Sequence, residues 1–126
     1  MSKNIKITLS DFLNENITRE VTKGKEGDCY KNVQDYLLDN DLPNAFIIHG
    51  QIVNKEGKVI NHAWIENGDE IIDPTTGIST SKSMYDDKLS PKEESRYDFS
   101  EALKMRFKTN NYGAWTPEER KKIIGR

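Results

Sequence analysis

The dipeptide Asn67-Gly68 lies between two short runs rich in β-branched residues, and it constrains the fold more than any other feature. Both residues of a tight hairpin turn of this kind adopt positive φ, which asparagine and glycine tolerate best. The runs on either side, 59–66 and 70–73, are therefore predicted to pair as antiparallel strands. A third run, 45–53, precedes them. The sequence thus predicts a small antiparallel sheet.

Helices are predicted on both sides of these strands, so the fold class is α+β. From Asp28, an acceptable N-cap, apolar residues recur with the spacing of one helix face up to about residue 38. They are Cys29, Val33, Tyr36 and Leu37. A second amphipathic helix is marked by Phe99, Ala102, Leu103 and Phe107.

A capping box with proline at the first helical position, Thr116-Pro117-Glu118-Glu119, begins a last helix that is predicted to run to about residue 124. The aromatic segment before it, 112–115, is expected to pack this helix onto the rest of the protein. Residues 77–97 show little periodicity and are predicted to be a polar loop. Alternation at 5–9 indicates one further short strand.

The chain has 126 residues, a length that is typical of one domain with a modest core. We expect a single domain, 1–126, with its core in 24–76 and a helical C-terminal region in 91–126. Hydrophobic residues make up 34% and charged residues 32%, so the surface is expected to be well solvated.

The formal net charge of −2 gives no attraction to nucleic acid. The excess of lysine and arginine after residue 91 is better explained as a solvated helical face. No stretch approaches the roughly 20 apolar residues of a membrane span. The first residues lack the apolar core of a secretory signal, and a single cysteine excludes an internal disulfide, so a cytoplasmic protein is expected. Nothing in the sequence indicates a cofactor.

Cys29, His62 and Asp73 supply the nucleophile, base and orienting carboxylate of an activated thiol. If 67–68 is a two-residue turn, His62 faces Asp73 directly, with Cβ atoms about 4.5–5.5 Å apart. Packing the apolar stripe of the first helix on the His62 face would bring the thiol to the imidazole. At a helix N-terminus the macrodipole also favours a thiolate.

Other residues are candidates for the substrate cleft. A four-residue loop at 54–57 would place His49 opposite His62, with Gln51 on the same face. Tyr30 follows the cysteine directly, and Trp64 lies two residues after His62 on the same strand. Trp64 is more readily explained as a core residue, and His49 as incidental.

Three segments together resemble the transglutaminase-like branch of the papain-like cysteine protease superfamily: Gly27-Asp28-Cys29-Tyr30, His62-Ala63-Trp64 and Asp73-Pro74-Thr75. The resemblance covers roughly residues 24–76. It implies a helix that bears Cys29 and packs on a small antiparallel sheet, with Cys29 as nucleophile, His62 as general base and Asp73 as its orienting partner. The chain departs from the family in two respects. It is small, whereas family members commonly carry a longer region around the core, and no glutamine precedes Cys29 to serve as an oxyanion-hole side chain.

Three functions fit these residues. The first is a thiol-dependent acyl-transfer enzyme, a peptidase, amidase, deamidase or transglutaminase, acting on a peptide, protein or small amide. The second is a catalytically inactive module on the same fold that holds a peptide or protein partner. The third is a metal site built on Cys29 and His62 with His49 or Asp73, although zinc sites usually have more cysteines or histidines at short spacing. The sequence does not decide the oligomeric state.

Overall fold

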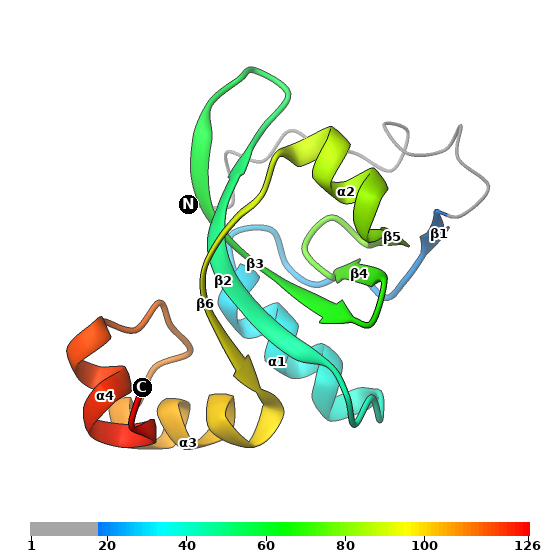
Figure 1. Ribbon diagram of the computed structural model, residues 1–126. Helices are drawn as coiled ribbons and strands as arrows, with labels where there is room; N and C mark the ends of the chain where they lie inside the picture. The colour runs from blue at the N-terminus through cyan, green and yellow to red at the C-terminus, as the bar shows by residue number, and fades with distance from the viewer. Residues whose placement is uncertain (1–17) are drawn as a thin grey trace.

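The computed structural model describes residues 18–126, so the strand expected at 5–9 lies outside the described residues. Within that range the chain forms a six-stranded antiparallel sheet in the order β1-β5-β4-β3-β2-β6 (Figure 1). The strands are β1 (Arg19–Glu20), β2 (Phe46–Val53), β3 (Val59–Asn67), β4 (Glu70–Asp73), β5 (Ile78–Ser81) and β6 (Lys92–Asp98). The helices are α1 (Cys29–Asp39), α2 (Lys82–Leu89), α3 (Phe99–Thr109) and α4 (Pro117–Ile124).

The hairpin between β3 and β4 forms where the sequence predicts it, but with a different register. Asn67 pairs with Glu70, so Gly68 and Asp69 are the turn residues, and of the turn residues only Gly68 has positive φ. Glycine at the first central position is the pattern of a type II′ turn. The predicted pairing of His62 with Asp73 is therefore wrong by two residues. A shift of two residues keeps every side chain on its original face, so both still point to the same side of the sheet.

The connection between β2 and β3 is one residue longer than predicted. Val53 pairs with Val59, and the Asn54 side chain accepts hydrogen bonds from the backbone N–H groups of Glu56 and Lys58, which shapes the five-residue loop. His62 consequently stands opposite Gly50, not opposite His49. Because a shift of one residue reverses the face, His49 and His62 point to opposite sides of the sheet.

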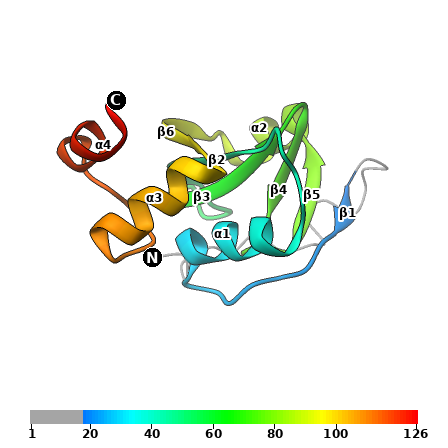
Figure 2. The ribbon, with the colours of Figure 1, turned by 90° about the horizontal axis from the view of Figure 1, so that it is seen from below.

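Each face of the sheet is covered by its own apolar core. On one side α1 and α3 pack on the sheet through Val33, Ala63, Ile65, Ile72 and Met105 with their neighbours. On the other side α2 packs over Trp64, Ile71 and Ile78 through Tyr85 and Leu89. Figure 2 shows α1 and α2 on opposite sides of the strands.

The apolar stripe of α1 packs on the face that carries Ala63 and Ile65. The expectation that this stripe covers the His62 face is therefore wrong. His62 lies on the other side, where its ring stacks on Trp64 with centroids 6.2 Å apart.

The segment 77–97 is not a loop, because it contains β5, α2 and β6. Helix α2 buries only Tyr85 and Leu89, too few apolar positions for a periodic signal, and it begins with Ser81 capping the N–H of Met84. Strand β6 carries charged residues on an exposed sheet edge, which protects an edge strand from pairing with other chains.

The remaining helices begin and end close to their predicted positions. Helix α1 starts directly after Asp28, although the carboxylate of that residue makes no capping hydrogen bond. Helix α4 has the predicted capping box, in which Thr116 and Glu119 bond each other's backbone N–H groups. Asp98 and Glu101 form a second capping box at the start of α3.

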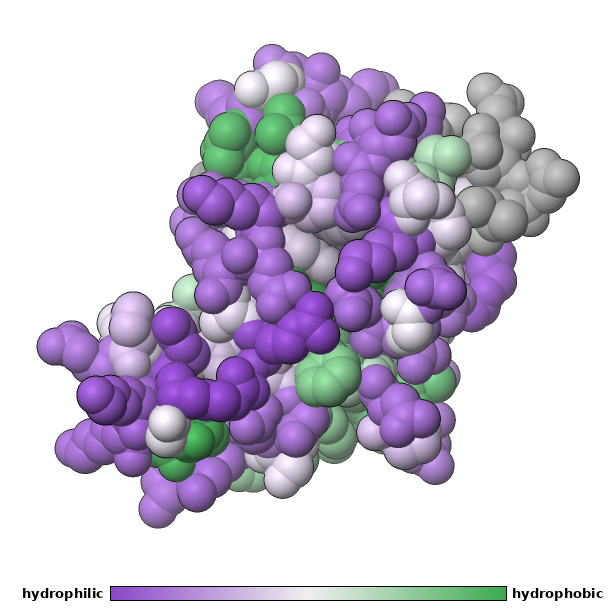
Figure 3. Space-filling view, viewed as in Figure 1, coloured by the Kyte–Doolittle hydropathy of each residue, from purple (hydrophilic) through white to green (hydrophobic). Residues whose placement is uncertain are grey.

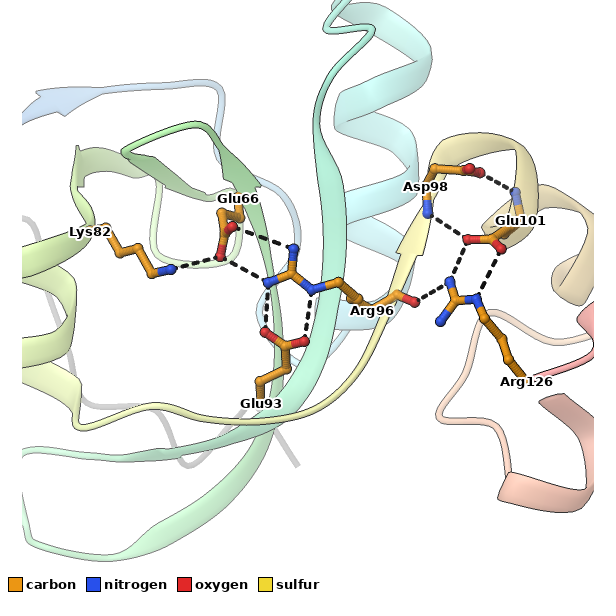
Figure 4. Close-up of polar contacts among 7 residues, drawn as sticks. All are labelled: Glu66, Lys82, Glu93, Arg96, Asp98, Glu101 and Arg126. Atoms are coloured by element: carbon orange, nitrogen blue, oxygen red, sulfur yellow. Dashed lines mark hydrogen bonds and ion pairs between the residues drawn. The ribbon is translucent and has the colours of Figure 1, made fainter. Parts of the chain in front are cut away.

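Charged side chains tie β6 to its surroundings (Figure 4). The guanidinium group of Arg96 contacts the carboxylates of Glu66 and Glu93, and Lys82 of α2 reaches Glu66 as well. Arg126 binds Glu101 and the backbone carbonyl of Arg96, which ties the end of the chain to α3 and β6. The face seen in Figure 3 is largely hydrophilic, and its apolar areas are small and separate. None of the described helices has the length and apolarity needed to cross a bilayer.

Candidate active site

His62 and Asp73 form a hydrogen-bonded pair in the interior of the protein. Nε2 of His62 lies 2.8 Å from Oδ2 of Asp73, and both side chains have no exposed surface. Ile65 pairs with Ile72, so in the same register Asp73 lies opposite Trp64. The contact between Asp73 and His62 is therefore diagonal across the hairpin. A diagonal neighbour on one face is within reach of a ring as long as imidazole.

Two further groups hold the carboxylate of Asp73 in place. The hydroxyl of Tyr85 donates to Oδ2 at 2.7 Å, and the backbone N–H of Thr76 donates to Oδ1 at 3.3 Å. The Thr76 hydroxyl also bonds the backbone carbonyl of Asp73. Sequence reasoning missed Tyr85, because it lies in the segment that was predicted to be a loop. Tyr85 is an isolated tyrosine, and no local pattern links it to Asp73, which lies twelve residues earlier.

The electrostatics of the pair favour its charged form. Burial by itself lowers the pKa of His62, but the charge of Asp73 and its hydrogen bond, with a further contribution from Cys29, raise that pKa to about 10. The pKa of Asp73 is lowered, since the opposing effect of burial is outweighed by His62, Tyr85 and Thr76. At neutral pH the pair is an imidazolium and a carboxylate.

Cys29 is the first residue of α1 and is buried in the core on the α1 side. Cys29 nevertheless makes a smaller contribution to the raised pKa of His62, which indicates that the thiol lies near the imidazole. Pairing between β3 and β4 starts at Ile65, so among the described strands none lies beside β3 at His62 on that side.

The start of α1 is anchored to the segment that follows β4. The Asn32 amide donates to the hydroxyl of Thr75 at 2.9 Å, and the N–H of Gly24 donates to the carbonyl of Pro74 at 2.8 Å. A Cβ at Gly24 would lie 2.3 Å from the Asn32 side chain, so only glycine permits this close approach. These contacts hold the segment that follows Asp73 against the start of α1.

Nδ1 of His62 has no hydrogen-bond partner among the described residues. Because Nε2 is engaged with Asp73, Nδ1 is the nitrogen left to exchange a proton with the thiol. The arrangement supplies the three parts of an activated thiol: a nucleophile, a base beside it, and a buried carboxylate that orients the base.

A pocket of about 490 Å³ opens at Cys29. One wall is the start of α1, a second comes from β3 through Asn61, and a third is the segment 112–114 that precedes α4. The amide of Gln34 donates to the carbonyl of Tyr112, which fastens this third wall to α1. A pocket of this size is suited to a side chain or a small molecule.

The four residues that the sequence suggested for a cleft have different positions. Tyr30 lines the pocket beside Cys29. His49 lies behind that wall, buried among Tyr30, Tyr97 and Trp115. Gln51 and Trp64 are outside the set that lines this pocket, and Trp64 belongs to the core on the α2 side.

His49 is an unusual core residue, since neither ring nitrogen has a hydrogen-bond partner in the described part of the chain. Burial, and secondarily the charge of Arg120, lower its pKa to about 3, so it is neutral at physiological pH. His49 therefore packs as an aromatic ring and takes no part in the pair formed by His62 and Asp73.

Asn61 and the segment 112–114 are the pocket residues that sequence reasoning missed. Asn61 directly precedes His62, and the alternation of β3 could have indicated that it points to the side of α1. The segment 112–114 was expected only to pack the last helix. Trp115 does so, being 5% exposed, while the three residues before it form the pocket wall.

Within residues 18–126 there is no group of three or more histidine, cysteine, aspartate or glutamate side chains placed to hold a metal ion. Comparisons with protein families, with curated proteins and with solved structures found no match to this chain.

Proposed function

We propose that this protein is a thiol-dependent acyl-transfer enzyme in which Cys29 is the nucleophile. The observation that carries the proposal is the fully buried pair of His62 and Asp73, whose imidazole is influenced by the thiol at the start of α1. A histidine and a carboxylate without exposed surface cost free energy to bury. Such groups with shifted pKa values concentrate at functional sites, and here they adjoin a pocket.

In the first step the thiolate of Cys29 attacks the carbonyl carbon of an amide or ester, and the carbonyl π electrons move to oxygen. When this intermediate collapses, the bond to the leaving amine or alcohol breaks. The imidazolium of His62 donates its Nδ1 proton to that leaving group. The products are a thioester on Cys29 and a neutral imidazole, which Asp73 holds in orientation.

In the second step water or an amine attacks the thioester and gives a proton to Nδ1 of His62, and the thiolate leaves. Water as acceptor makes the protein a peptidase, amidase or deamidase, and an amine makes it a transglutaminase. The expected substrate is a peptide, a protein or a small amide. A helix that begins with the cysteine and packs on an antiparallel sheet agrees with the resemblance to the transglutaminase-like branch of the papain-like superfamily.

One observation favours a different function, a catalytically inactive module that holds a peptide or protein partner. Cys29 is only 3% exposed, which limits access of a substrate carbonyl to its sulfur. The pocket beside it would then serve for binding alone, and the buried pair would be structural.

The rate of alkylation of Cys29 by iodoacetamide separates these two functions. An unassisted thiol is only a few per cent ionised at pH 7, so a thiolate stabilised by His62 should react roughly thirtyfold faster. His62→Ala should remove this advantage, while His49→Leu, which alters the buried histidine outside the pair, should retain it. Slow alkylation of equal rate in all three proteins would leave the binding module as the better description.

A further inference from the structure

We propose that the side-chain amide of Asn61 donates a hydrogen bond to the oxyanion that forms when Cys29 attacks a carbonyl group. This inference rests on the proposed acyl-transfer function and assigns the residue that stabilises its transition state. Negative charge on the former carbonyl oxygen needs donors that are already in position, since these lower the barrier most. The start of α1, which forms the first wall of the pocket, supplies only some of the donors that an oxyanion needs.

The position of Asn61 follows from the alternation of β3. Ala63 and Ile65 belong to the core on the α1 side, and Asn61 continues their row. His62, the next residue, points to the opposite face and binds Asp73. Asn61 and Cys29 line the same pocket. Asn61 thus lines the pocket on the α1 side of the sheet, while His62, the next residue, lies on the other side.

Gln51 contacts the acceptor end of the Asn61 amide. The two residues are directly paired between β2 and β3, and Nε2 of Gln51 donates to Oδ1 of Asn61 at 3.5 Å. The acceptor end of Asn61 is thereby turned toward β2. Its Nδ2 group has two protons to donate and makes no hydrogen bond to another described residue, and Asn61 is one of the residues that line the pocket.

Backbone donors lie on the other side of the thiol. The first hydrogen bond of the helix runs from the N–H of Asn32 to the carbonyl of Asp28, so the N–H groups of residues 29–31 have no partner within the helix. The Asp28 side chain does not cap them. An oxygen atom between the start of α1 and Asn61 would receive hydrogen bonds from both walls.

Tyr30 is the competing neutral donor in the pocket, and it provides the matched control. Burial raises the pKa of Tyr30 to about 12, so its hydroxyl keeps its proton and can donate a hydrogen bond, as the amide of Asn61 can. Lys31, the remaining donor at the helix start, is paired with Asp35 on the surface. Asn61→Leu and Tyr30→Phe each remove one donor and keep the approximate size of the side chain.

Two reactions of Cys29 distinguish stabilisation of an oxyanion from a structural role. Acylation by p-nitrophenyl acetate passes through an oxyanion, whereas alkylation by iodoacetamide displaces iodide without forming one. Asn61→Leu should lower the acylation rate constant by about 10²–10³-fold, the usual effect of losing one such donor. Its alkylation rate should stay within about twofold of the wild-type rate, because the thiolate is untouched. Gln51→Leu should lower acylation by a smaller factor.

The inference is overturned if Asn61→Leu acylates at the wild-type rate, or if acylation and alkylation fall in parallel as they would after a general disturbance. A large loss of acylation in Tyr30→Phe with none in Asn61→Leu would assign the role to Tyr30. Cys29→Ala measures the background hydrolysis. If wild-type protein releases p-nitrophenol no faster than Cys29→Ala, the proposed function itself fails, and the inference falls with it.

Discussion

Nε2 of His62 and Oδ2 of Asp73 lie 2.8 Å apart in a region that solvent does not reach. A charged pair is stable at such a site only when each member satisfies the other and the remaining lone pairs have partners. Tyr85 and Thr76 provide those partners for Asp73, while Nδ1 of His62 is left without one in the described part of the chain. The unsatisfied nitrogen is therefore the chemically available end of an otherwise complete network.

Asp73→Asn tests the electrostatic half of this network, since an amide keeps the shape of the carboxylate but removes its charge. We expect the pKa of His62 to fall well below its present value of about 10. We also expect the protein to lose about 3–5 kcal/mol of stability, the usual cost of breaking a buried pair. An NMR titration of the imidazole and urea unfolding measure the two effects. An unchanged titration of His62 would show that Asp73 does not control its charge.

Tyr85→Phe removes one hydroxyl and keeps the buried ring. Without that donor, the negative charge of the Asp73 carboxylate is shared with fewer hydrogen bonds, so it should stabilise the imidazolium of His62 more strongly. The pKa of His62 should therefore rise further, which an NMR titration of the imidazole measures. The stability should fall by about 1.5–3 kcal/mol, the contribution of a hydrogen bond to a charged group. Loss of stability without any change in the titration of His62 would make Tyr85 a purely structural residue.

The two histidines predict a maximum of stability near pH 6.5. The pKa of His49 is lowered to about 3, so between pH 6.5 and 3 the unfolded chain binds more protons and stability is lost as pH falls. The pKa of His62 is raised to about 10, so its contribution is complete below pH 6.5 and is lost as pH rises toward 10. At low pH the folded protein loses further stability, because Asp73 becomes protonated.

The variant His49→Leu isolates the acidic limb of this profile. It should reduce the slope of the unfolding free energy between pH 4 and 6 by up to about 1.4 kcal/mol per pH unit, the equivalent of one proton. Urea unfolding at several pH values in this range provides the measurement. An unaltered slope in the variant would mean that His49 is not kept neutral in the folded protein.

Gly113→Ala tests how closely the wall formed by 112–114 is fitted to the core. Gly113 has φ of +123°, and a Cβ there would lie 2.7 Å from Cε1 of His49. Gly57 has φ of +77° with nothing near its Cβ position, so Gly57→Ala measures backbone strain alone. We expect Gly113→Ala to cost about 1–3 kcal/mol more than the control, and to slow acylation of Cys29. Equal stability of the two variants would show that the wall can move away from His49 freely.

Local signals predicted many of the elements. The spacing of Cys29, Val33 and Leu37 predicted α1, and the capping box at Thr116 predicted α4, because both depend on residues within a few positions of each other. Helix α2 and strands β5 and β6 were missed. Their positions depend on contacts with distant elements, such as Tyr85 with Asp73 and Arg96 with Glu66. No local pattern reports such contacts.

By itself, the sequence determined that His62 and Asp73 share a face, because a register error of two residues leaves the alternation of side chains unchanged. It also determined that Cys29 begins a helix. The tertiary structure alone decided which face of the sheet that helix covers, and that His49 points away from His62. These features depend on the length of one loop and on the fit between packed surfaces, and such fits are set by atoms far apart in the chain.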